Sequence, residues 1–170
     1  MRGAVRPLVR RLAAYAVDVA VLAAILIPLA FAIQLLVAYR AETGMGVWLT
    51  SLATISAPSW TYFTLSDASS GGATLGKRML ALRVSSVDGQ RIGLGQALAR
   101  TAIKLIPWEL THLTTFALSP QPGTVSGLQL GLLWIVYGLF AIYLIAALRN
   151  RGERSVHDLV VATAVRRRAA

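Results

Sequence analysis

The stretch RRLAAYAVDVAVLAAILI, residues 10–27, sets the fold class because it places an aspartate, Asp18, inside an otherwise apolar helical run. The apolar run extends from Leu12 to Ala38. As a helix it would be about 40 Å long, enough to cross the ~30 Å of hydrocarbon in a bilayer with some tilt. A charged side chain at that depth costs about 3 kcal/mol on insertion scales, so we expect Asp18 to meet a polar partner from another segment.

The composition around this run is that of a membrane protein. The chain has 170 residues, of which 56% are hydrophobic and 14% charged, whereas soluble domains carry about 25% charged residues. Its 17 basic and 7 acidic residues give a net charge of +10, but the polar surface is too small for a soluble nucleic-acid binder, and we expect no nucleic-acid partner. The absence of cysteine excludes disulfides, thiolate ligands and cysteine nucleophiles.

Three further segments complete a predicted four-helix transmembrane bundle. Residues 47–66 have aromatic side chains near both ends, and residues 128–148 carry no charge. Residues 97–118 carry four ionisable side chains, so hydropathy alone does not identify them as a membrane span. The distribution of basic residues along the chain favours a crossing. If residues 97–118 cross the bilayer, the basic clusters of the N-terminus, the central loop and the C-terminus all lie on the cytoplasmic side with both termini. The alternative for this segment is a re-entrant or interfacial amphipathic helix.

The connecting loop, residues 67–96, is predicted to be cytoplasmic and to contain a small β-hairpin. Leu82 and Val84 alternate with Ala81, Arg83 and Ser85, and Asp88-Gly89 supplies a two-residue turn. The cytoplasmic C-terminal segment, residues 149–170, fits either a short third strand or an interfacial helix. No long internal repeat is visible. The chain is thus predicted to be one domain, residues 1–170: an all-α membrane protein with a small hairpin between its second and third helices.

Residues 71–77, GGATLGK, match the core of a nucleotide-binding P-loop, but their context argues against nucleotide binding. Arg78 stands where a Ser or Thr hydroxyl would bind magnesium, and a membrane span precedes the motif in place of a buried strand. We interpret the motif as a glycine-rich turn that leads into a helix. Lys77 and Arg78 of that helix are predicted to contact lipid headgroups or an acidic partner.

Asp18 is expected to find its partner on another predicted helix. Arg11 lies two helical turns away, which disfavours a direct contact, so the candidates are Lys104 and His112 of the third predicted helix, with Arg100 and Arg149 near the same membrane boundary. Glu109 and His112 share a helix face at a spacing that some metal ligands use, but Asp18 would have to be the third donor. We favour a polar pair that bonds across helices, and we predict no metal and no cofactor.

Three ordered motifs resemble the RDD family of bacterial membrane proteins, named for one arginine and two aspartates. RRLAAYAVD is similar to its first-helix signature, at Arg11 and Asp18, and GATLGKRMLALRVSSVDG is similar to its central loop. RSVHDLVVAT is similar to its closing motif and places the second aspartate at Asp158. Ala81 and Ala162 stand where glycine is common in the family. The resemblance implies the bacterial cytoplasmic (inner) membrane and transport of unidentified ligands, with sodium or proton exchange proposed for some members and assembly roles for others.

Two functional hypotheses follow for a predicted buried cluster of Arg11, Asp18, Lys104, Glu109, His112 and Asp158. In the first, the protein transports a small ion or ligand, and Asp18 binds a cation or proton that Glu109 and His112 relay. Four spans enclose little space, so this hypothesis requires a homo-oligomer. In the second, the protein is a noncatalytic assembly or lipid-binding subunit, whose partners are the bilayer or another membrane protein. A membrane enzyme has only the Glu109–His112 pair to support it, and we expect no enzymatic activity.

Overall fold

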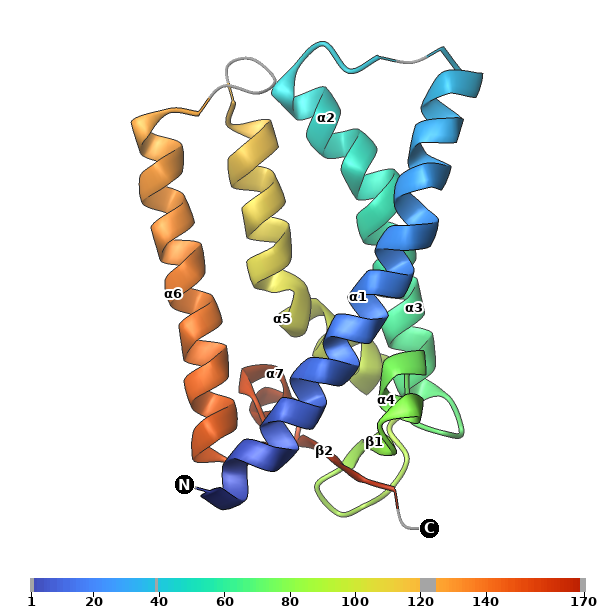
Figure 1. Cartoon of the computed structure of the whole chain (residues 1–170), viewed down its shortest axis with the longest axis vertical. Helices are drawn as coiled ribbons and strands as arrows, with labels where there is room; N and C mark the ends of the chain where they lie inside the picture. Colours follow the sequence, from blue (N-terminus) through green and yellow to red (C-terminus); the bar gives the residue numbers. More distant parts are fainter. Residues whose placement is uncertain (1, 39, 120–124, 169–170) are drawn as a thin grey trace.

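The computed structural model describes residues 2–38, 40–119 and 125–168, which form a mostly helical bundle with a small sheet at one end (Figure 1). Long helical segments run along the bundle, each opposite in direction to the one before it. They are α1 (Arg2–Leu36), the segment α2–η1–α3 (Gly44–Ser51, Leu52–Ser56 and Ala57–Ala68), the segment α5–η2 (Leu94–His112 and Leu113–Ala117), and α6 (Gly127–Arg149). The short elements gather where α1 begins and α6 ends: α4 (Leu75–Met79), β1 (Leu82–Ser86), α7 (Val156–Val160) and β2 (Thr163–Arg167).

Helices α1 and α6 are long and apolar enough to cross a membrane. Arg6–Leu36 contains a window of mean hydropathy 2.6 and Gly127–Arg149 one of 2.3, and only 11% of either window is buried. Their side chains therefore point outward, as Phe31 at 65% and Trp134 at 74% exposure illustrate. Water-soluble monomers rarely expose so much apolar surface, whereas lipid tails would cover it. The helices predicted at 12–38 and 128–148 are therefore confirmed as helices long and apolar enough to cross a membrane.

The helices predicted at 47–66 and 97–118 are also present, but each contains a π-helical segment, η1 or η2. A π turn leaves backbone carbonyls without their usual helical donors. The buried Gln129 of α6 supplies donors to η2, because its amide nitrogen lies 3.0 Å from the Thr114 carbonyl oxygen and 3.3 Å from that of Thr115. Gln129 thereby ties the start of α6 to the end of α5–η2.

The sheet is not the hairpin predicted within residues 67–96. Strand β1 pairs antiparallel with β2 of the C-terminal segment, with Val84 opposite Val165. The Asp88-Gly89 turn is present, but the chain then begins α5 at Leu94 where the hairpin required a second strand. The hairpin prediction is therefore wrong, and of the two alternatives for the C-terminal segment the strand is correct.

Burial explains why β1 takes a distant partner. Leu82, Val84 and Val165 are buried together with Ala14 of α1 in the small core at this end of the bundle. A local hairpin would leave the β2 side chains without this core, and burial of a large aliphatic side chain contributes about 1.5–3 kcal/mol. The C-terminal strand therefore completes a core that the central loop alone cannot form.

The structure also shows an internal repeat. Thr74 caps α4 before Ala81 and β1, and Ser155 caps α7 before Ala162 and β2 at the same spacings. Both alanines are left-handed, with φ of 51° and 54°. Each unit follows a pair of antiparallel long helices (Figure 1). The chain therefore repeats a short helix–turn–strand unit, once in each half, and the strands of the two units pair with each other in the sheet.

Candidate functional site

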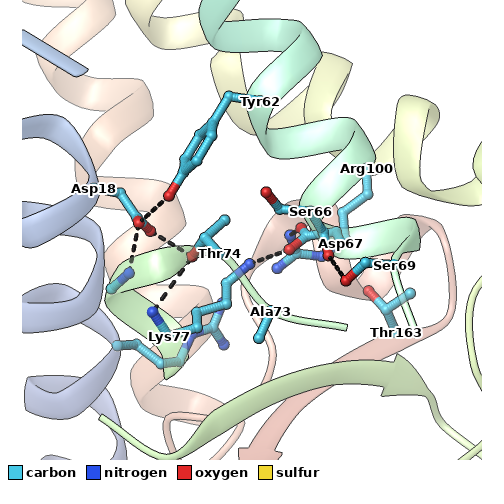
Figure 2. A network of polar contacts seen from close by, with 12 residues as sticks. Asp18, Tyr62, Ser66, Asp67, Ser69, Ala73, Thr74, Lys77, Arg100 and Thr163 are labelled. Carbon is cyan, nitrogen blue, oxygen red and sulfur yellow. Dashed lines mark hydrogen bonds and ion pairs between the residues drawn. The ribbon is translucent and has the colours of Figure 1, made fainter. Parts of the chain in front are cut away.

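The first polar group is centred on Asp18, which lies inside α1. Its buried carboxylate accepts hydrogen bonds from the Tyr62 hydroxyl at 2.7 Å, the Thr74 hydroxyl at 2.6 Å and the Gly76 amide at 2.7 Å (Figure 2). Tyr62 belongs to α3, whereas Thr74 and Gly76 belong to the start of α4. The prediction that another segment meets this carboxylate is confirmed. The partners are these donors, and the predicted pairing of Asp18 with Lys104 or His112 is wrong.

Helix α4 approaches α1 closely because residue 76 is glycine. A β-carbon at Gly76 would lie 2.0 Å from the Ala14 carbonyl oxygen, which is far inside van der Waals contact. The Gly76 amide and the Thr74 hydroxyl of the P-loop-like sequence therefore both donate hydrogen bonds to the Asp18 carboxylate. Since Asp18 occupies the place that a phosphate would need, the interpretation of GGATLGK as a turn leading into a helix agrees with the structure.

The second polar group is a buried chain of ion pairs, hereafter the ion-pair chain: Lys77, Asp67, Arg100, Asp158 and Arg11. Lys77 pairs with one oxygen of Asp67, and Arg100 lies 2.5 Å from the other (Figure 2). Arg100 also lies 2.9 Å from Asp158, whose second oxygen is 2.6 Å from Arg11. These side chains come from α4, α3, α5, α7 and α1, so the ion-pair chain links five elements at one end of the bundle.

Asp158 also caps α7. It accepts hydrogen bonds from the Ser155 amide at 3.0 Å and from the Thr163 hydroxyl at 2.9 Å. Burial acts to raise the pKa of this carboxyl, but nearby positive charge, first that of Arg100, holds the pKa well below its ordinary value. Burial lowers the pKa of the His157 imidazole to about 4, and the proximity of Asp158 offsets this only in part. At neutral pH, Asp158 is therefore charged and His157 is neutral.

Lys104 has an unusual environment for a charged side chain. Its ammonium nitrogen lies 3.1 Å from the centre of the Phe63 ring and 4.9 Å from that of Tyr15. Ring faces attract cations, but more weakly than a carboxylate does in a buried site. Among the described residues no carboxylate lies within ion-pair distance of Lys104, so the aromatic rings are its protein partners.

Glu109 and His112 do not join the polar groups around Asp18 and Asp158. Glu109 accepts hydrogen bonds from the Ser56 hydroxyl at 3.1 Å and the Trp60 indole at 3.0 Å. His112 packs against the Trp108 and Phe116 rings. The predicted cluster of six is therefore wrong as one unit: Arg11 and Asp158 pair, Asp18 and Lys104 lie near them, and Glu109 and His112 lie apart.

An open cavity of about 200 Å³ lies between α1, α5 and α6. Its lining combines apolar side chains with a basic group, and among the described residues Asp18 is its single carboxylate. The basic lining residues are Arg11, Lys77, Arg100 and Lys104. Asp67 and Asp158 lie outside the lining but form ion pairs with these basic residues. The four basic side chains therefore meet three carboxylates, those two and Asp18, which leaves one positive charge in excess.

The predicted cluster of six lacks both Arg100 and Asp67, and the sequence interpretation missed Asp67 altogether. It lies one residue beyond the predicted span 47–66 and falls in the predicted loop, where an aspartate needs no partner. In the structure it is completely buried between Lys77 and Arg100. The sequence does contain a signal, because Arg100 within an apolar helix requires a carboxylate from a neighbouring segment.

The predicted contact of Lys77 with a lipid headgroup or an acidic partner is a second correction, because Lys77 pairs with an aspartate of its own chain. Its ammonium points inward to Asp67 and is largely buried (Figure 2). Arg78, by contrast, is exposed, although its guanidinium also donates to the Ala73 carbonyl oxygen at 3.1 Å. The two neighbours therefore have opposite orientations, and only Arg78 remains available for a headgroup.

The sequence is similar to a known protein family. A sequence model of the RDD family matches residues 5–162. No curated protein and no solved structure matches the chain. The family match agrees with the three motifs at Arg11 and Asp18, in the central loop, and at Asp158.

Proposed function

This chain belongs to the RDD family of membrane proteins, and on that premise we propose that it is a noncatalytic protein that binds an anion at the cytoplasmic end of four membrane spans. The cavity between α1, α5 and α6 is the observation that carries the proposal. Four cations and a single carboxylate line it, and Asp18 already accepts three hydrogen bonds. An anion would neutralise the excess positive charge, and of the four cations that line the cavity Lys104 is the one that forms no ion pair with a described residue.

The four-span arrangement is supported by length and charge. The segments 44–68 and 94–117 would each be about 36 Å long as helices, enough for the ~30 Å of hydrocarbon. The basic clusters lie beside α4, α7 and the sheet, at one end of the bundle. Because basic loops stay in the cytoplasm, we place this end and both termini inside and the protein in the bacterial cytoplasmic membrane.

Titration with inorganic phosphate tests the proposal. The purified protein in a neutral detergent is expected to bind phosphate saturably, measured by isothermal calorimetry. Lys104→Gln should weaken binding at least tenfold, and Lys104→Arg should restore it because the charge returns. Arg83→Gln, which removes an exposed cation outside the cavity, is the matched control. Absence of saturable anion binding by the wild-type protein overturns the proposal.

Cation or proton transport is the second candidate function. It is favoured by the burial of Asp18 inside a helix of membrane-spanning length, beside the cavity. Its weakness is that a cation would have to displace three hydrogen-bond donors from this carboxylate. In proteoliposomes with an imposed sodium or proton gradient, transport predicts wild-type flux that Asp18→Asn abolishes. Wild-type inactivity under either gradient argues against this candidate.

A further inference from the structure

Resting on the proposed anion-binding function, we infer that the anion is the acidic headgroup of a membrane lipid, which enters the cavity sideways between α1 and α6. The cavity is open to the outside, and exposed side chains of α1 and α6 are part of its lining. In the described chain these are the two helices that are long and apolar enough to cross a membrane. A ligand that reaches the cavity between them therefore comes from the hydrocarbon of the bilayer.

The rim of the cavity is apolar and faces outward. Leu12 of α1 is 51% exposed, and Phe140 and Leu144 of α6 are 45% and 43% exposed, although all three line the cavity. Side chains that both line a cavity and face lipid form a continuous path between the two. An acyl chain can follow this path without leaving an apolar environment, whereas a hydrated anion would meet no polar group on it.

The interior of the cavity has the opposite chemistry. Arg11, Arg100 and Lys104 line it together with Tyr143 and His157. The two arginines already pair with Asp158, so Lys104 is the group with unused charge. A phosphate on Lys104 would complete a charge-assisted contact in a partly apolar site, where such contacts are stronger than in water.

The positions of the apolar rim and the basic interior along the bundle fit a lipid of the cytoplasmic leaflet. Ala147 lines the cavity near the end of α6, and Phe140 lines it about 10 Å further into the bundle. His157 of α7 and Leu82 and Val165 of the sheet also line the cavity. Its basic interior therefore lies at the end of the bundle that we place in the cytoplasm. The headgroup therefore lies at the level of the other headgroups, and the acyl chain lies beside the lipid tails.

The test compares a lipid with a free anion on the same protein. Native mass spectrometry would count bound dioleoyl phosphatidic acid, with dioleoyl phosphatidylcholine as the lipid of equal chains and no net charge. Inorganic phosphate, measured by calorimetry, reports the anion site alone. We expect phosphatidic acid to bind at least tenfold more tightly than either, in a ratio of one per chain.

A bulky residue at the rim separates the acyl path from the anion site. Leu144→Trp narrows the opening and is expected to weaken phosphatidic acid binding at least tenfold while phosphate binding stays unchanged. Ile145→Trp is the matched control, because Ile145 is the next residue of α6, is 48% exposed and does not line the cavity. Leu12→Trp on the α1 side is a second rim variant, in case Leu144→Trp disturbs folding.

The outcomes distinguish this inference from the proposed function. Selective loss of phosphatidic acid binding in both rim variants, with Ile145→Trp unaffected, supports lateral entry of a lipid. Equal affinity for phosphate and phosphatidic acid, unchanged by the rim variants, means that the ligand is a free anion, which overturns the inference and leaves the proposed function standing. If neither phosphate nor phosphatidic acid binds, both are overturned.

Discussion

At the scale of single residues, Arg100 is the centre of the buried electrostatics. It lies within 3 Å of both Asp67 and Asp158, and so joins the two halves of the chain. Burying such pairs costs desolvation free energy that their attraction only partly returns, yet removing one partner leaves an uncompensated charge. The ion-pair chain therefore specifies how the elements meet, and its members are interdependent.

Asp67→Asn tests this interdependence. It leaves Lys77 and Arg100 with one fewer negative charge, so we expect the free energy of unfolding to fall by about 3–5 kcal/mol. Thermal or urea unfolding in the same detergent measures the loss. Glu153→Gln removes the partner of Arg166, 3.3 Å away, in a pair that is about two-fifths exposed on both sides, and should cost less than ~1 kcal/mol. Equal effects of the two substitutions would contradict the importance assigned to burial.

His157 makes stability depend on pH. Its pKa is about 4 in the folded protein against an ordinary value of 6.5, so only the unfolded chain takes up this proton between these pH values. The free energy of unfolding is expected to fall as the pH drops through this window, by about 3 kcal/mol in total. Stability curves of wild type and His157→Gln measure the difference. A variant with the same pH dependence as wild type would show that another group titrates.

At the scale of elements, the contact between α1 and α4 depends on a missing side chain. Gly76→Ala places a methyl group against the Ala14 carbonyl and forces α4 away from Asp18, with an expected cost of about 2–3 kcal/mol. Gly95→Ala is the control, because a β-carbon at this position of α5 would meet no atom of the described residues within 4 Å, and it should be neutral or stabilise by up to ~1 kcal/mol. Unfolding of both variants in detergent, with helix content from circular dichroism, provides the measurement.

The repeated helix-to-strand turns predict stabilising substitutions. Ala81 and Ala162 are left-handed, a conformation that costs non-glycine residues about 1 kcal/mol. Ala81→Gly and Ala162→Gly should therefore each raise the free energy of unfolding by up to ~1 kcal/mol, less the entropy that glycine adds to the unfolded chain. Ala97→Gly, within α5, should lower it by a similar amount. Destabilisation by both turn substitutions would refute the strain argument.

At the scale of the whole molecule, the topology depends on whether α5–η2 crosses the bilayer. The chain has no cysteine, so single cysteines can report the side of the membrane without background. Val125→Cys is expected to react with an impermeant maleimide in intact cells, whereas Asp88→Cys should react only after lysis. Val125 is exposed, and Asp88 lies in the turn that follows β1. Labelling of both only after lysis would show that α5–η2 is re-entrant, the alternative that its ionisable residues also allow.

The long helices, the need of Asp18 for a polar partner from another segment, and the family could all be predicted from the amino-acid sequence. Each of these depends on local information, because the length of an apolar run, a charge inside it and a motif can be read from neighbouring residues. Asp67 is an exception, although its signal is also local. The predicted span ends at residue 66, one residue before Asp67, whereas α3 continues to Ala68.

Which groups meet is settled by the three-dimensional fold alone. Three contacts bring together residues that are far apart in the chain. Strand β1 pairs with β2, Arg100 links Asp67 to Asp158, and Lys104 lies over the Phe63 ring. The sequence offers each of these residues many partners of suitable charge or hydrophobicity. The choice among them depends on packing, because α4 and α7 reach their positions only where glycine, capping residues and the shared core permit close approach.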